Sequence, residues 1–173
     1  MRYAASVEYE GTNFFGWQRQ SAVISVQEEI ENAISQITQT DIKIHGAGRT
    51  DAGVHALGQV FHFDTDVTRP IKSLTKGVNS FLPNSIRVKW VKIVSDDFHA
   101  RFSATARQYQ YLLNNAPINS SIWSNHCGWT FYELDFTLLK NASKKFEGRH
   151  DFTAFRSSEC QAKSPIRSIK NIS

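Results

Sequence analysis

The chain has few cysteines and no long apolar run. Its two cysteines, Cys127 and Cys160, stand far apart in 173 residues and form no CxxC pair, which argues against a disulfide framework or a cysteine-based zinc site. No apolar stretch approaches the roughly 18 residues of a membrane span. The opening MRYAASVEYEG carries glutamates where a signal peptide needs apolar residues. These absences predict a soluble cytoplasmic protein in a reducing compartment.

The composition indicates an ordered protein with a slight excess of positive charge. Hydrophobic residues make up 40% and charged residues 21% of the chain, so a buried core is feasible and extensive disorder is not expected. The length suits one domain or two small ones. The formal net charge is +4, which mildly favours a polyanionic partner.

The first half of the chain alternates between strand and helix patterns. Period-two patterns predict strands and a 3.6-residue apolar period predicts helices. The expected elements are strands over 2–10, 41–45, 59–65 and 86–94, and helices over 25–39 and 70–81. Their β-α-β-β-α-β order is that of the ferredoxin-like or RNP-like fold, an antiparallel sheet with helices on one face. We therefore expect an α+β protein whose first half, residues 1–95, contains a glycine-rich loop at 46–58.

The second half, residues 96–173, predicts only part of such a unit. ATARQYQYLLNN, residues 104–115, alternates like a strand, Asp135 can cap a helix that Gly148 closes, and a further strand begins at Ile166. This β-α-β pattern lacks a second β-α-β. A sheet of that size leaves an uncovered edge, so we expect either a fragment or another element over the edge.

The segment HGAGRTDAGVHALGQV, residues 45–60, carries one carboxylate among glycines. It does not match a dinucleotide-binding fingerprint, because the position of the third glycine is Asp51, whose charge repels a pyrophosphate. Two interpretations remain. Glycine and aspartate are common in tight turns, and a carboxylate held rigidly beside Arg49 also suits nucleophilic catalysis.

Aromatic and basic residues interleave at three places, in NFFGWQRQ, FHARFSATARQYQY and RHDFTAFR. Each aromatic ring could simply belong to the core, but together the clusters favour single-stranded RNA, whose bases stack on rings and whose phosphates bind arginine. The arginines expected to contact RNA are Arg19, Arg101 and Arg107. Tyr109 and Tyr111 share one face of their predicted strand, where a phenol packs in the core or stacks on a base.

A metal-dependent hydrolase is a further possible function for the segment around Asp51. It would use His45, His55 and Asp51 as ligands. The spacing of these residues, with no cysteine and no second carboxylate nearby, matches no common ligand set.

Five segments of the chain together resemble the TruA-type tRNA pseudouridine synthases. The resemblance runs from residue 3 to about 172, and GRTDAGVHA is its most specific part. The segments are YEGTNFFGWQRQ, SVQEEIENAI, GAGRTDAGVHALGQV, LPNSIRVKWVKIVSDDFHARFSATARQYQYLL and HDFTAFRSSECQA.

The resemblance implies an enzyme that converts uridine to pseudouridine at positions 38, 39 and 40 of the tRNA anticodon stem-loop. It implies no cofactor and no metal, and a homodimer whose two chains form a basic cleft for the RNA. It places the catalytic aspartate at Asp51, the arginine that probes the RNA at Arg49, and the tyrosine that stacks on the extruded base at Tyr109.

Members of this family continue beyond the length of this chain. Their further segment carries an arginine that pairs with the catalytic aspartate, and no similar segment occurs here. Two functions are therefore expected from the sequence, a tRNA pseudouridine synthase and a truncated relative that binds tRNA but catalyses weakly.

Overall fold

The computed structural model describes residues 1–156 and 163–173, so Cys160 and the end of the last family-like segment lie outside the described residues. Contacts within the chain divide it into two compact units, Met1–Gln110 and Tyr111–Ser173. The first unit extends beyond the boundary at residue 95 that the sequence suggests, because Phe98 and Ala100 bond to residues of the sheet and Arg107 bonds to Ala47 in the glycine-rich loop.

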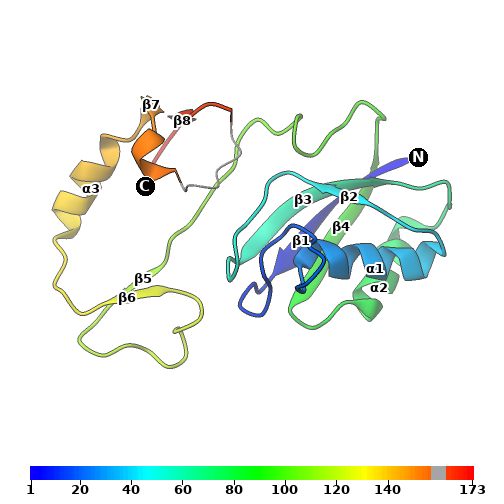
Figure 1. The fold of residues 1–173 in the computed structure, drawn as a ribbon, viewed down its shortest axis with the longest axis horizontal. Helices are drawn as coiled ribbons and strands as arrows, with labels where there is room; N and C mark the ends of the chain where they lie inside the picture. Colours follow the sequence, from blue (N-terminus) through cyan, green and yellow to red (C-terminus); the bar gives the residue numbers. More distant parts are fainter. Residues whose placement is uncertain (157–162) are drawn as a thin grey trace. The chain divides into compact units, whose positions relative to one another are not determined.

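The first unit is one antiparallel sheet with two helices (Figure 1). Its elements follow the predicted β-α-β-β-α-β order, and its four strands lie in the order β2-β3-β1-β4. Every neighbouring pair of strands is antiparallel, which confirms the predicted antiparallel sheet combined with helices. The elements are β1 (Arg2–Tyr9), α1 (Val26–Thr38), β2 (Ile44–Gly46), β3 (Ala56–Asp64), α2 (Ile71–Phe81) and β4 (Ile86–Val94).

Both helices pack on the same face of this sheet. The alternate residues of β1, from Tyr3 to Tyr9, are buried in one hydrophobic cluster with Ile30 and Ile34 of α1 and Leu74 of α2. Each fully buried aliphatic side chain of this kind contributes about 1.5–3 kcal/mol relative to exposure. The apolar residues that alternate along the strands and those that recur along the helices therefore pack together in one core.

The start of α1 is set by the capping residue predicted from the sequence. The Ser25 side chain accepts a hydrogen bond from the backbone N–H of Glu28 at 3.3 Å, which satisfies one of the free donors at a helix N-terminus. At the other end Gln39 adopts a left-handed conformation with φ 56°. The helix thus lies within one residue of the predicted limits at each end.

The strands around the glycine-rich loop differ from their predicted bounds. β3 begins at Ala56 rather than Gln59, and β2 covers Ile44–Gly46 rather than 41–45. The early start of β3 has a tertiary cause, because Tyr9 of β1 pairs with Ala56 beyond a register shift. Backbone pairing defines a strand, so Ala56, Leu57 and Gly58 belong to β3 although their sequence ALG shows no alternation.

The other face of the sheet is partly covered by the segment after β4. The Arg2 guanidinium bonds Asp64 at 2.8 and 2.9 Å and donates to the carbonyl of Phe98 at 2.9 Å. His62 of β3 is buried and its Nδ1 accepts from the backbone N–H of Ala100 at 3.2 Å. These bonds hold residues 96–100 to the first unit.

His62 stacks on His45 and meets the ring of His99 edge-on, and its environment opposes protonation. His45 lies 5.0 Å and His99 4.5 Å from it between ring centroids. Burial, then the nearby charges of the other histidines and Arg2, lower the pKa of His62 from 6.5 to about 4, with Asp64 opposing the shift. The neutral ring is the form that accepts the Ala100 hydrogen bond.

Lowering the pH is expected to destabilise the first unit through His62. The unfolded chain takes up this proton near pH 6.5 and the folded chain only near pH 4. The free energy of unfolding is therefore highest above pH 6.5. It decreases between pH 6.5 and 4 and is constant again below pH 4 with respect to this group. The loss is about 2 kcal/mol after solvent screening is allowed for. Urea unfolding across this pH range measures it. His62→Asn, whose amide oxygen can take the place of Nδ1 and accept from Ala100, should flatten the curve; equal curves for both proteins would contradict the assignment.

The second unit contains short elements and few buried side chains. β5 pairs in parallel with β6, and β7 pairs antiparallel with β8. α3 begins where predicted, because Asp135 accepts a bond from the N–H of Leu138 at 2.9 Å. The bounds are β5 (Leu113–Asn115), β6 (Gly128–Thr130), α3 (Phe136–Lys144), β7 (Gly148–Asp151), the 3-10 helix η1 (Thr153–Phe155) and β8 (Ile166–Ile169).

The predicted strand over 104–115 is wrong for most of its length. Only Leu113–Asn115 pair with a neighbour, and residues 104–112 are in no regular element. Alternation makes a segment suitable for a strand, but a strand forms only where a neighbouring strand accepts its backbone bonds. Among the described residues no strand does so for residues 104–111, and Leu112 is reached only by one bond from Gly128 to its carbonyl.

None of the helices in the described part of the chain is both long and apolar enough to cross a membrane.

Candidate active site

The loop that carries Asp51 is held by a second loop, residues 11–17, which follows β1. The backbone N–H of Trp17 donates to the carbonyl of Thr50 at 3.0 Å, and the N–H of Gly53 donates to the carbonyl of Phe14 at 3.2 Å. The carbonyl of Asp51 itself accepts from Val54 at 3.2 Å. The backbone on both sides of Asp51 is therefore fixed, while its side chain is exposed.

The two loops approach so closely that one position requires glycine. Gly16 has φ +87°, and a Cβ added there would lie 2.5 Å from the carbonyl oxygen of Thr50. That separation is shorter than any real contact of a Cβ atom, and a left-handed φ is itself unfavourable for other residues. The loop before α1 can thus lie against Thr50 only because residue 16 has no side chain.

Buried aromatic side chains of the hydrophobic core support the loop that carries Asp51. The hydroxyl of Tyr9 lies 2.8 Å from Oγ1 of Thr50. Burial raises the pKa of Tyr9, with the Thr50 hydrogen bond opposing the shift, so the phenol is neutral at physiological pH. Trp17 is also buried, with its ring 5.9 Å from that of Tyr9. Asp51 therefore stands on a loop anchored in packed aromatic side chains.

A shallow depression adjoins the residues that follow Asp51. Its volume is about 330 Å³, and it lies between the 11–17 loop and the turn at Ala52 and Gly53. Phe15 at its edge is 60% exposed. Large exposed rings beside a fixed polar loop suit stacking on an unpaired base.

The predicted arginines have different surroundings in the structure. Arg49 is exposed on the same loop as Asp51, and Arg101 is exposed with its guanidinium carbon 5.8 Å from the ring centre of Phe102. Arg19, however, pairs with Glu31 at 2.9 Å and Glu28 at 3.3 Å on α1. Much of the binding capacity of Arg19 is thus directed at the helix α1 that follows it in the chain.

Arg107 and Tyr109 lie on the irregular segment after Ala100. The guanidinium of Arg107 donates to the carbonyl of Ala47, at the start of the Asp51 loop, with Nε 3.1 Å from the oxygen. Tyr109, two residues later, is 77% exposed. The structure thus connects the segment of Tyr109 to the loop of Asp51 through Arg107.

The 11–17 loop as a clamp was not predicted from the sequence. The aromatic and basic residues of NFFGWQRQ indicate RNA binding and give no sign of a contact with the Asp51 loop. The available signal was the pair Gly11 and Gly16 flanking buried Phe14 and ahead of buried Trp17. Two glycines around large apolar side chains indicate close backbone approach, but not which segment approaches.

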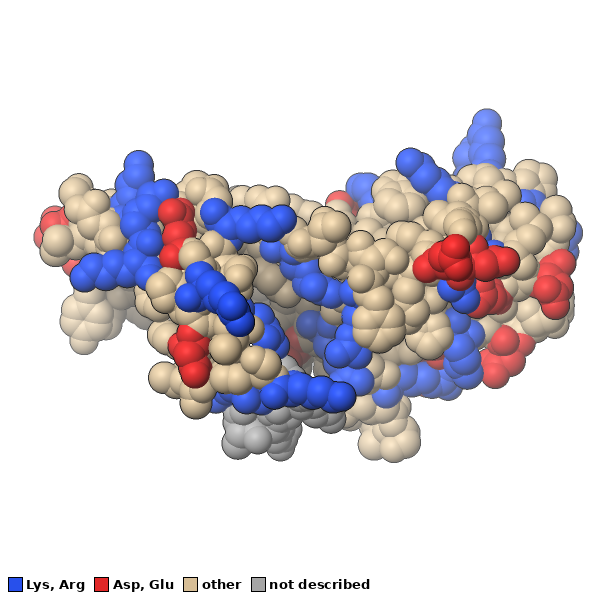
Figure 2. Space-filling model, turned by 90° about the horizontal axis from the view of Figure 1, so that it is seen from above, with Lys and Arg blue, Asp and Glu red and all other residues tan. Residues whose placement is uncertain are grey.

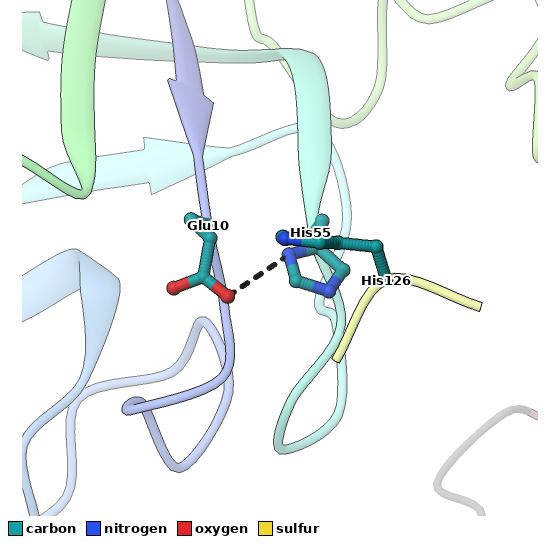
Figure 3. A group of neighbouring side chains, drawn as sticks. All are labelled: Glu10, His55 and His126. Carbon is teal, nitrogen blue, oxygen red and sulfur yellow. Dashed lines mark ion pairs between the residues drawn. The ribbon is translucent and has the colours of Figure 1, made fainter. Parts of the chain in front are cut away.

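The metal ligands weighed from the sequence do not form a cluster within the first unit. Nδ1 of His55 accepts from the N–H of Gly11 at 3.1 Å and lies 3.6 Å from Glu10 (Figure 3), whereas His45 stacks on His62. His126, also drawn, belongs to the other unit. Within the described part of the first unit, no three potential ligands meet around Asp51.

Basic side chains are distributed over both units. Figure 2 shows lysine and arginine side chains along the face in view, with carboxylates gathered in fewer places. The overall excess is four charges. An excess of positive charge attracts a polyanion over a distance of about 8–10 Å at physiological ionic strength.

Comparison with known proteins places the chain in one family. A family model described as tRNA pseudouridine synthase matches residues 5–103 and 142–173. The chain is 49% identical over 172 residues to tRNA pseudouridine synthase A of Pseudoalteromonas atlantica, and 49% identical over 171 residues to that of Colwellia psychrerythraea. Each match covers 99% of this chain but 65% and 66% of the relative. The chain therefore spans just under two thirds of the length of these curated relatives.

Proposed function

The chain belongs to the tRNA pseudouridine synthase family, and we propose that it isomerises uridine to pseudouridine in the anticodon stem-loop of tRNA, on its 3′ side. The observation that carries the proposal is the exposed Asp51 on a backbone held on both sides by the 11–17 loop. Catalysis by a carboxylate needs this rigid positioning next to an accessible substrate.

In the proposed reaction Asp51 is the nucleophile. The target uridine first leaves the base stack, because its glycosidic bond is inaccessible inside a helix. The N1–C1′ bond breaks, the uracil turns, the C5–C1′ bond forms, C5 loses a proton and N1 gains one. Atoms and electrons balance without an oxidant or a metal. Attack by Asp51 at C1′ of the ribose and attack at C6 of the uracil both fit the position of one carboxylate.

We assign binding roles to the residues around Asp51. Arg49 enters the RNA beside the target nucleotide, and the ring of Tyr109 stacks on the extruded uracil. Both are exposed, as groups that meet a ligand must be. Arg101 contacts phosphate. Arg19 and Arg107 contribute less to phosphate binding than their positions in the sequence suggest, since protein groups already occupy much of their donors.

The proposal also includes the fold of the first unit, the oligomeric state and the place of action. The β-α-β-β-α-β order and the sheet order β2-β3-β1-β4 support a ferredoxin-like arrangement of the first unit. A homodimer would place two basic surfaces around one tRNA. The site of action would be the cytoplasm, where tRNA is modified.

Release of tritium from tRNA labelled at C5 of uridine tests the proposed reaction directly, because the C5 proton leaves in every turnover. The assay is made on chain 1–173, and on the same chain joined to the part of the Pseudoalteromonas atlantica relative that it does not cover. Binding of tRNA without tritium release by either protein would instead favour an RNA-binding relative.

The affinity for tRNA should depend steeply on salt. Each neutralised phosphate releases counterions, so four or five contacts lower the affinity about 10²-fold between roughly 50 and 200 mM salt. Arg101→Ala should reduce the slope of log K against log salt by about 0.7–0.9. Filter binding across salt concentrations measures both. An affinity that is constant over this range would exclude phosphate contacts as its main source.

A further inference from the structure

We propose that Arg107 is a positioning residue, which fixes the segment bearing Tyr109 against the loop bearing Asp51. This inference rests on the proposed function and replaces the phosphate contact that the sequence suggests for Arg107. It concerns how the stacking ring and the carboxylate, which lie on different segments of the first unit, are kept at a constant separation.

The contacts of Arg107 are directed at backbone carbonyls. Nε and Nη2 both donate to the carbonyl oxygen of Ala47, and Nη2 also lies 3.4 Å from the carbonyl oxygen of Arg101. One guanidinium thus joins the Asp51 loop to the turn at Arg101. A planar fork of donors can make this set of bonds and the single ammonium of lysine cannot reproduce it.

The loop backbone that Arg107 bonds, at Ala47, is itself held by hydrogen bonds to β3. The N–H of Ala47 donates to the carbonyl of Val60 in β3 at 2.7 Å, and the amide of Gln59 donates to the carbonyl of Gly48 at 2.8 Å. Ala47 is buried. A Cβ on Gly48 would lie 3.3 Å from Nε of Arg107, so the side chain lies directly over the loop backbone.

The segment that Arg107 belongs to has few other means of support. Residues 104–112 form no strand and are almost all exposed. The preceding anchor is the bond from Ala100 to His62. Because two residues span at most about 7 Å, fixing Arg107 restricts where Tyr109 can lie. Without the Arg107 bonds, eight residues would separate the ring from the anchor at Ala100.

The position of Arg107 therefore bears on catalysis more than on affinity. A displacement of about 1 Å between reacting groups can cost about 10²-fold in rate. A phosphate contact, in contrast, changes the affinity and its salt dependence. The two roles predict opposite results for the same substitutions.

Two variants of Arg107 separate the roles, with Arg101→Ala as the matched control for a phosphate contact. Arg107→Lys keeps the charge and loses the fork, and Arg107→Ala loses both. Hydrogen exchange of the Ala47 and Gly53 amides, the salt slope of tRNA binding, and kcat for tritium release are measured for each protein. Exchange and binding use chain 1–173; kcat uses this chain and its extended form.

A positioning role predicts faster exchange at Ala47 and Gly53 in both Arg107 variants. It also predicts a kcat about 10 to 100 times lower in both, with the salt slope kept by Arg107→Lys. Wild-type exchange and kcat in Arg107→Lys, together with a slope reduced in Arg107→Ala as in Arg101→Ala, would overturn it. If the unaltered proteins neither bind tRNA nor release tritium, the proposed function fails, while the exchange rates still decide whether Arg107 holds the loop.

Discussion

Replacing Asp51 by asparagine is expected to abolish tritium release and to leave tRNA binding almost unchanged. The amide has nearly the shape of the carboxylate but is a far poorer nucleophile, and removal of a nucleophile costs more than about 10³-fold in turnover. The backbone bonds that hold the loop do not involve the side chain of Asp51, so the fold should persist. Turnover is measured with the extended chain, and affinity by filter binding.

Asp41→Asn is the matched control for this substitution. Asp41 is an exposed carboxylate that pairs with Lys43 at 3.1 Å, and an exposed pair of this kind contributes about 0–1 kcal/mol. It should therefore behave like the unaltered protein. Turnover near the unaltered rate in Asp51→Asn would mean that Asp51 only shapes the turn, which is the other interpretation that its sequence context allows.

Gly16→Ala is expected to disrupt the site by separating the two loops. The new Cβ would meet Thr50 at 2.5 Å and the backbone would be held at φ +87°, and strain and overpacking together cost about 3 kcal/mol. Gly53→Ala isolates the strain, because φ is +78° but nothing lies within 4 Å of the added Cβ. That variant should lose about 1–2 kcal/mol.

Urea unfolding and tritium release test this pair together. Gly16→Ala should lower both the unfolding midpoint and turnover, because displacement of Thr50 moves the adjacent Asp51. Gly53→Ala should lower the midpoint less. Equal effects of the two substitutions would show that backbone conformation, and not the contact between the loops, accounts for glycine at position 16.

The amino-acid sequence by itself determined the elements whose residues carry their own signals. The capping residue Ser25 and the apolar period that follows it specified α1. Strict alternation specified β4 from Ile86 to Val94, and Asp135 specified the start of α3. Caps and periodicity act between neighbours in the chain, so no partner is needed to recognise them. The motif around Asp51 likewise identified the family, which the comparisons confirm.

Only the tertiary structure decided which segments act on one another. It showed that the strand expected at 104–112 is absent, and that Arg19 and Arg107 bond to Glu31 and Ala47. It also showed that Gly16 lies against Thr50. A strand, an ion pair or a close backbone contact depends on a partner distant in the chain. Composition and local spacing specify what a residue can bind, and the fold alone specifies which group reaches it.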